Sequence, residues 1–165
     1  MKKIVSLLLI LVVATPVWAY GRKIQLNTVL KKELNQVLKA TDELHEACFD
    51  QDEPLISAKL RSVIKAIDAA NDKIMLADTQ KIHLDKLLKS AKSDLEKSQM
   101  SSGKERRDSL KSAFHQIVTM VKTYKLDSYK IFFCPKDRSV WIQKSWKAKN
   151  PINPKKYGSC GRPVR

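Results

Sequence analysis

Three cysteines and three histidines are the side chains of this 165-residue sequence that are best suited to chemistry. Cys134 and Cys160 lie near the C-terminal end, with 25 residues between them. A bridge between the two would close that loop and stabilise the fold by roughly 3.5 kcal/mol in the chain-entropy model. Because the number of cysteines is odd, one intramolecular bridge at most can form and one thiol is left over.

His45 and Cys48 are three residues apart, so a helix would place both on one face, where they could reach one metal ion. Two ligands do not form a tight site, and Cys48 also falls on an apolar stripe, where a buried core cysteine is expected. His83 and His115 each adjoin a stripe residue and are predicted to face solvent. No carboxylate pair, Ser/His/Asp set or glycine-rich phosphate loop can be assembled, so the sequence predicts a protein without enzymatic activity.

Apolar residues recur at steps of three and four from about residue 24 to 127, which is the period of a helix. Breaks at 50–52, near Asp78 and at 101–103 divide this stretch into four helices, with Pro54 in the opening turn of the second. Four helices of about 20 residues with short connections predict an all-α fold, an antiparallel four-helix bundle with a short irregular C-terminal extension. A simple scaffold or dimerisation bundle has the same pattern.

The N-terminus has the layout of a secretion signal. Lys2 and Lys3 precede an apolar run from residue 4 to 14, and Val17-Trp18-Ala19 forms a cleavage site. This run is shorter than the about 20 apolar residues that cross a bilayer as a helix. We therefore expect cleavage after Ala19, export to the periplasm of a bacterium, and a mature chain without a transmembrane segment; an uncleaved anchor is the alternative.

These observations predict three parts, namely a signal peptide (1–19), a helical bundle (20–128) and a C-terminal extension (129–165) packed on the bundle. Within the extension, residues 129–133 are aromatic and β-branched and predict a strand or an extended segment. The two Asn-Pro steps at 150–151 and 153–154 favour turns. Trp141 and Trp146 are expected to pack the extension onto the bundle.

Positive charge is concentrated in the same extension. The whole sequence carries a net charge of +15, which becomes +13 without Lys2 and Lys3. Residues 134–165 contain one acid, Asp137, and nine basic residues: Lys136, Arg138, Lys144, Lys147, Lys149, Lys155, Lys156, Arg162 and Arg165. Export would exclude nucleic acid as the partner, so we expect lipid head groups, lipopolysaccharide phosphates or acidic protein surfaces. A solvated surface that only promotes solubility is the alternative.

The order of motifs in the extension resembles a known family. Cys134-Pro135, Trp141-Ile142, two Asn-Pro steps, Tyr157-Gly158 and Cys160-Gly161 follow one another as in the family catalogued as domain of unknown function 3347. The resemblance covers essentially the whole mature chain. It implies a bacterial envelope protein with a helical body, related to domains that are appended to periplasmic adaptors of copper and silver efflux pumps.

The resemblance also implies a site for Cu(I) or Ag(I) at Cys134 and Cys160, because thiolates and thioethers are soft ligands. The family has a methionine near each of these cysteines. Here Lys136 replaces the first, and no methionine lies between Tyr157 and Cys160. The pair is therefore either a disulfide, which an oxidising compartment favours, or a dithiol site for metal.

Two functions follow from these alternatives. The first is a non-catalytic accessory protein in soft-metal handling. The second is an envelope interaction module that docks on anionic lipid or protein surfaces through its basic extension.

Overall fold

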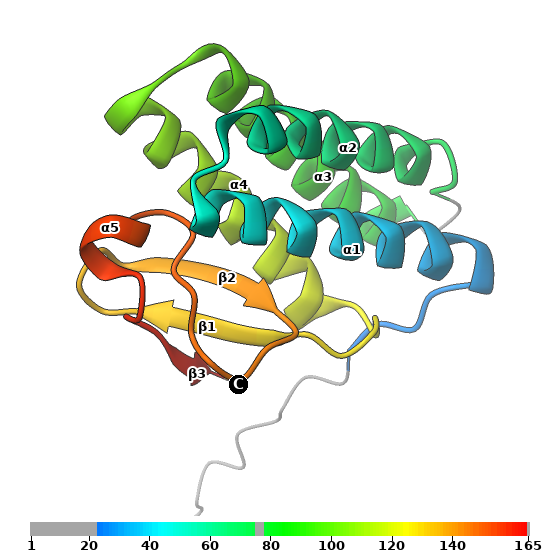
Figure 1. Ribbon diagram of the computed structural model, residues 1–165. Coiled ribbons are helices and arrows are strands. Elements are labelled where there is room, and N and C mark those ends of the chain that lie inside the picture. Colours follow the sequence, from blue (N-terminus) through cyan, green and yellow to red (C-terminus); the bar gives the residue numbers. More distant parts are fainter. Residues whose placement is uncertain (1–22, 75–77, 165) are drawn as a thin grey trace, which may run out of the picture.

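The computed structural model describes residues 23–74 and 78–164, so the predicted signal peptide and Arg165 lie outside the described residues. Four long helices make up most of the fold: α1 (Thr28–Asp50), α2 (Glu53–Asn71), α3 (Asp78–Met100) and α4 (Gly103–Thr123). Consecutive helices run antiparallel and pack side by side (Figure 1). The predicted helical bundle is confirmed.

Helices α1 and α2 begin where side chains satisfy free backbone groups. Side-chain oxygens of Asn27 and Asp52 accept hydrogen bonds from the backbone N–H three residues on, at 2.8 and 2.9 Å. Gln51, between α1 and α2, has a φ of 59°, a left-handed conformation that ends the helix. Pro54 lies in the first turn of α2, where its missing N–H has no structural consequence.

The C-terminal segment is not irregular, and that part of the predicted fold class was wrong. Strands β1 (Lys130–Cys134), β2 (Ser139–Gln143) and β3 (Arg162–Val164) form an antiparallel sheet in the order β2-β1-β3. A short helix, α5 (Pro154–Tyr157), lies between β2 and β3. Strands of three to five residues carry too little periodicity to be recognised alone. Their existence depends on pairing with β1, which was the one strand that the sequence indicated.

One hydrophobic core joins the sheet and the bundle. Strand β2 packs against both α1 and α4, so the sheet covers the groove between the first and the last long helix (Figure 1). Phe132, Trp141 and Ile142 are buried in the same cluster as the apolar stripes of the helices. Phe132 and Trp141 are cross-strand partners whose ring centroids lie 5.8 Å apart. The extension is therefore part of the core of the molecule.

Candidate functional site

His45 is buried on α1, where it faces the segment that follows β2. Its Nε2 lies 2.7 Å from the backbone carbonyl of Lys149, so Nε2 carries the proton and donates. Burial lowers the pKa of His45, and the ring is neutral near pH 7. Its Nδ1 has no hydrogen-bond partner among the described residues and lies 3.5 Å from a carboxylate oxygen of Glu46. The imidazole therefore acts as a tether between α1 and the C-terminal segment.

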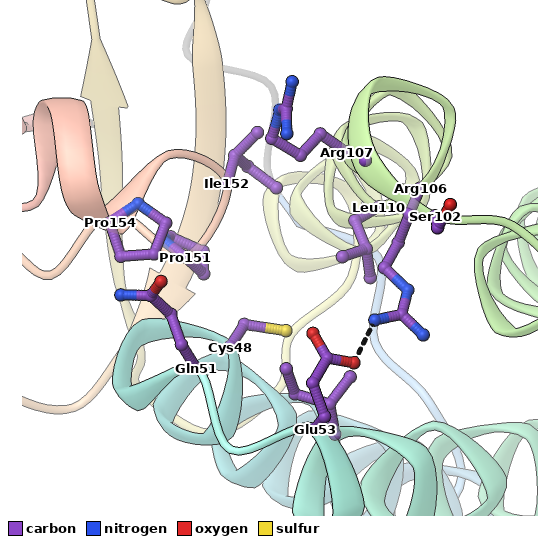
Figure 2. Close-up of a pocket in the computed structure, with 12 residues that line it drawn as sticks. Cys48, Gln51, Glu53, Ser102, Arg106, Arg107, Leu110, Pro151, Ile152 and Pro154 are labelled. Carbon is purple, nitrogen blue, oxygen red and sulfur yellow. Dashed lines mark hydrogen bonds and ion pairs between the residues drawn. The ribbon is translucent and has the colours of Figure 1, made fainter.

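Cys48 is a free, buried thiol that lines a pocket of about 380 Å³ between α1, α2, α4 and residues 151–154. Figure 2 shows its sulfur pointing into this pocket beside the ion pair of Glu53 with Arg106. Burial raises the pKa of Cys48 to about 12, so the sulfur is a protonated thiol at neutral pH. A protonated thiol is a poor metal ligand.

Among the described residues, neither His45 nor Cys48 belongs to a larger set of metal ligands. Within residues 23–74 and 78–164, the structure contains no group of three or more His, Cys, Asp or Glu side chains that could hold a metal ion. His83 and His115 are both exposed, and His83 Nδ1 lies 3.0 Å from the hydroxyl of Tyr124. The geometry therefore assembles no metal centre from the histidines and Cys48.

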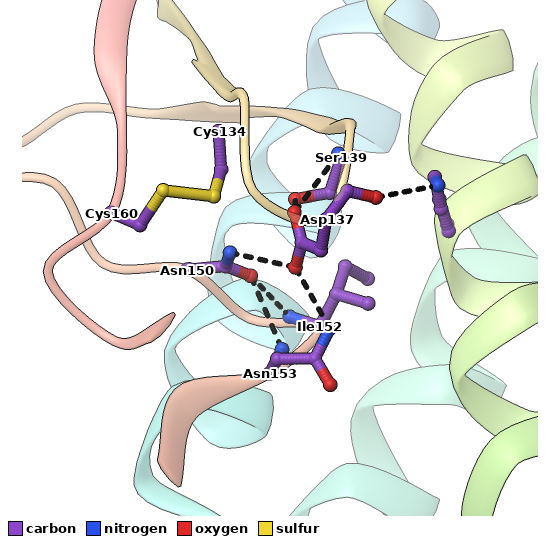
Figure 3. Close-up of a disulfide and its surroundings, with 8 residues drawn as sticks. Cys134, Asp137, Ser139, Asn150, Ile152, Asn153 and Cys160 are labelled. Carbon is purple, nitrogen blue, oxygen red and sulfur yellow. Dashed lines mark hydrogen bonds between the residues drawn. A yellow bond between two sulfur atoms is a disulfide. The ribbon is translucent and has the colours of Figure 1, made fainter. Parts of the chain in front are cut away.

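Cys134 and Cys160 form a disulfide that joins the end of β1 to the residues before β3 (Figure 3). Cys134 is fully buried. Bridged sulfurs carry no thiolate, which is the form that binds soft metals. Of the two alternatives for this pair, the structure has the disulfide.

Asp137, in the turn between β1 and β2, organises the residues around the disulfide (Figure 3). One carboxylate oxygen accepts hydrogen bonds from the backbone N–H and the hydroxyl of Ser139, and the other accepts from the side-chain amides of Asn150 and Asn153. Burial alone would raise the pKa of Asp137, but these hydrogen bonds outweigh it and hold the pKa below its usual value. The only acid of the basic segment is thus a structural anchor.

The predicted basic residues do not form one patch, because the β1–β2 hairpin separates them. We call the group around the β1–β2 turn the turn-end cluster, and the group at the opposite end of the hairpin the loop-end cluster. The turn-end cluster comprises Lys136, Arg138, Lys155, Lys156 and Arg162. The loop-end cluster comprises Lys144, Lys147 and a further lysine, Lys130, that was not among the predicted residues.

Lys149 has a different role from the other basic residues. Its ammonium group pairs with the carboxylate of Glu46 on α1, and its carbonyl accepts the hydrogen bond from His45. Among the described residues from 134 onward, Lys149 is the one basic side chain with an acidic partner within 4.0 Å. Within the described part of the chain, the other basic side chains of the segment have no ion-pair partner at this distance. Arg165, the ninth predicted residue, lies outside the described residues.

The two tryptophans of the C-terminal segment have opposite environments. Trp141 is fully buried, whereas 78% of Trp146 is exposed, so the prediction that Trp146 packs on the bundle was wrong. Its flanking residues contain the signal for this difference. Trp141 has the apolar neighbours Val140 and Ile142, but Trp146 lies between Ser145 and Lys147, outside any alternating strand pattern.

Trp146 belongs to a loop that a buried glutamine holds in place. We call residues 144–149 the Trp146 loop. The side-chain oxygen of Gln143 accepts hydrogen bonds from Trp141 Nε1 and the backbone N–H of Lys149, at 2.8 and 3.1 Å. Its amide nitrogen donates to the carbonyls of Ser145 and Lys147, at 3.0 and 2.8 Å. Gln143 thus uses its two donors and both acceptor positions, and it ties both ends of the loop to β2.

These features define a class of protein, a four-helix bundle whose disulfide-closed sheet presents unpaired positive charge and an exposed tryptophan. Comparison of the chain with family models, with curated proteins and with solved structures finds no match. The resemblance to the domain of unknown function 3347 family therefore stays a prediction.

Proposed function

We propose that this protein is an exported, non-catalytic interaction module that docks on an anionic component of the bacterial envelope through its C-terminal segment. The observation that carries this proposal is the unpaired charge of the turn-end and loop-end clusters. Positive side chains on an ordered surface that have no ion-pair partner within 4.0 Å among the described residues raise the local concentration of an anionic partner and accelerate its association.

Two observations support export as the setting of this function. The N-terminal sequence has the three parts of a secretion signal, and a structural disulfide such as Cys134–Cys160 persists in an oxidising compartment. No helix within the described ranges is long and apolar enough to cross a membrane. Intact-mass measurement of the protein recovered from a periplasmic extract tests the proposal, since cleavage after Ala19 predicts a chain that begins at Tyr20.

Docking is tested by binding to anionic surfaces at rising ionic strength. The probes are vesicles of phosphatidylglycerol with phosphatidylcholine, vesicles of phosphatidylcholine alone, and lipopolysaccharide. An electrostatic contact must weaken as salt shortens the Debye length to about 8 Å at physiological ionic strength. We expect salt-sensitive binding to at least one anionic probe and none to the neutral vesicles. Binding that is absent from every anionic probe, or indifferent to salt, would refute the proposal.

Matched charge variants separate a specific surface from net charge alone. The turn-end variant is K136Q/R138Q/K155Q/K156Q, and the control K81Q/K86Q/K97Q/K104Q removes the same charge from exposed positions on α3 and α4. Each basic residue that lies at an anionic surface contributes about 1 kcal/mol. Because the two clusters lie at opposite ends of the hairpin, we expect the loss of binding per charge removed to exceed that of the control in the turn-end variant or in the loop-end variant K144Q/K147Q. Losses equal to the control in both would show that the C-terminal segment has no special role.

Metal handling, which the family resemblance implied, is less well supported by the geometry because both sulfurs of the predicted pair are bridged. Reduction would have to precede binding. Titration of the reduced protein with Cu(I) against a competing chelator tests this function, with Cys134→Ser and Cys160→Ser as the comparison. Tight binding that both substitutions abolish would revive it.

A further inference from the structure

The Trp146 loop presents one large apolar side chain to solvent from a backbone that is firmly held. Trp146 is 78% exposed, although Gln143 fixes the loop with three hydrogen bonds, to Ser145, Lys147 and Lys149. The backbone N–H of Lys144 also donates to Asp42 on α1, at 3.3 Å, which joins the start of the loop to the bundle. An exposed tryptophan on a mobile segment could be incidental, but here the fold holds the backbone around it in place.

The indole ring is itself positioned. The ammonium group of Lys130 lies 4.2 Å from the centre of the ring and also donates to the carbonyl of Lys144, so one cation links the ring to the loop backbone. The loop-end cluster therefore combines an aromatic side chain with lysines. Lys144 also lies near a second aromatic ring, at 5.4 Å from the ring centre of Tyr129.

This combination matches the boundary between lipid head groups and acyl chains. Tryptophan is enriched there because its ring is apolar and its N–H is polar. Lysines can extend their apolar stems along the same boundary while their ammonium groups reach anionic phosphates. Both requirements are met within the four residues Lys144, Ser145, Trp146 and Lys147.

We propose that the Trp146 loop inserts its indole ring into the head-group region of an anionic phospholipid bilayer, with Lys130, Lys144 and Lys147 contacting lipid phosphates. The inference rests on the proposed docking function and names its partner. We choose a bilayer over a protein partner because insertion needs only a projecting tip such as Trp146, whereas a stable protein interface buries about 800 Å² on each side.

Fluorescence can follow Trp146 directly. The protein is expressed from the full sequence with Trp18→Phe, so that buried Trp141 and exposed Trp146 are the two tryptophans left. The probe is a vesicle of phosphatidylglycerol and phosphatidylcholine, with and without bromine on the acyl chains. We expect a blue shift of the emission on binding and quenching by brominated lipid. Adding Trp146→Phe should remove both signals, because the one tryptophan that is left, Trp141, is buried in the core and does not reach the lipid.

Affinity supplies the second readout. Trp146→Ala should weaken binding to anionic vesicles about tenfold, because the contact of a large apolar side chain is lost. Met100→Ala is the matched control, since Met100 is also exposed, at 82%, but lies on α3. K144Q/K147Q should weaken binding about fivefold for each lysine, and K97Q/K104Q, which removes the same charge elsewhere, should have little effect.

The outcomes distinguish this inference from the function on which it rests. Salt-sensitive binding to anionic vesicles without quenching of Trp146 would refute insertion and leave electrostatic docking intact. Binding to lipopolysaccharide or to an acidic protein but not to phospholipid vesicles would refute the bilayer as the partner and keep the proposed function. Absence of binding to every anionic probe would refute both.

Discussion

Buried polar side chains in this protein connect the helical bundle to the C-terminal segment. His45 donates to the carbonyl of Lys149, and Gln143 receives and donates hydrogen bonds on both sides of the Trp146 loop. Such groups are costly to leave without partners, because an unsatisfied buried donor or acceptor destabilises the fold by about 1–3 kcal/mol. The position of the loop is therefore determined by individual hydrogen bonds as well as by apolar contact.

The buried His45 predicts a stability that falls as the pH decreases. Burial holds its pKa below the ordinary value of 6.5, so the unfolded chain binds a proton that the folded protein rejects. The hydrogen bond to the Lys149 carbonyl favours the charged ring, as do Glu46 and Asp42, whereas the Lys149 ammonium group disfavours it; the favourable contributions do not reverse the direction. The contribution of neutral His45 to the free energy of unfolding is fully present above about pH 6.5. It is lost as the pH falls through that value towards the lower pKa of the folded state.

Urea unfolding at pH 7.5 and pH 5.5 measures this effect. The wild-type protein should lose stability between the two values, and His45→Gln should have a smaller loss because its side chain does not titrate. The exposed His83 provides the control, His83→Gln, which should keep the wild-type dependence. If His45→Gln loses as much stability between pH 7.5 and pH 5.5 as the wild-type protein, burial of His45 is not the cause of the loss.

Gln143 gives a second prediction at the scale of one residue. In the wild-type protein, the side-chain oxygen of Gln143 accepts hydrogen bonds from Trp141 Nε1 and from the backbone N–H of Lys149. Gln143→Leu keeps the bulk of the side chain but leaves both donors without this partner. We expect a destabilisation of about 2–4 kcal/mol and faster hydrogen exchange in the Trp146 loop. Exposed Gln99 on α3 is the control position, where Gln99→Leu should change stability little. Unchanged exchange in the loop would show that apolar packing alone holds it.

At the scale of elements, the sheet is stabilised at one end by covalent and polar links. The disulfide joins β1 to the segment before β3, and Asp137 binds the β1–β2 turn to the residues before α5. Strand β3 has only three residues, so pairing alone gives it little stability. The bridge is what restricts the chain to conformations in which β3 lies beside β1.

Removal of the bridge tests this role. In C134S/C160S the unfolded chain regains the conformational freedom that a bridge between residues 26 positions apart removes. We expect the free energy of unfolding to fall by roughly 3.5 kcal/mol. Chemical unfolding of the variant and of the reduced wild-type protein should agree. Cys48→Ser in the oxidised protein is a separate comparison, because this thiol takes no part in the bridge. A loss below about 1 kcal/mol would mean that β3 is held by other contacts.

At the scale of the whole molecule, the sheet completes the bundle. The groove between α1 and α4 is covered by β2, and Trp141 and Ile142 are fully buried there. Removing the sheet would expose apolar side chains of two helices to water, at about 25 cal/mol for each Å². The two predicted regions, 20–128 and 129–165, therefore share a core in the structure.

Truncation after residue 128 should give a protein that no longer unfolds cooperatively. Apolar surface on α1 and α4 would be uncovered while the helices keep part of their hydrogen bonding, which is the behaviour of a molten globule. The expected signs are binding of an apolar fluorescent dye and loss of near-ultraviolet circular dichroism with retained helical signal. The full-length C134S/C160S variant is the control. Cooperative unfolding of the truncated chain would show that the bundle is independent.

Much of the helical part could be predicted from the sequence. The period of Leu30, Leu34 and Leu38, the break after Asp50 and the position of Pro54 are local properties, and the structure has the helices that they indicate. The free Cys48 on an apolar stripe was likewise expected to be buried, and it is. Such features are encoded over a few neighbouring residues, so one sequence is enough to find them.

Contacts between distant residues could not be predicted in the same way. The hydrogen bond from His45 to Lys149 spans 104 residues, and the register that places Phe132 beside Trp141 depends on strand pairing. The basic residues lie within one segment of the sequence, yet the hairpin places those that the structure describes at two ends of the sheet. A count of charges along the sequence cannot reveal this separation, because the separation arises from the antiparallel pairing of β1 and β2.

The cysteines and the tryptophans show the same division. From residue types and spacing alone it follows that Cys134 and Cys160 could close a loop and that Trp141 and Trp146 lie in a basic segment. The bridge between the two sulfurs, the burial of one indole and the exposure of the other are known from the folded structure. Residue type limits the chemistry available to a side chain, whereas burial depends on which distant elements pack around it.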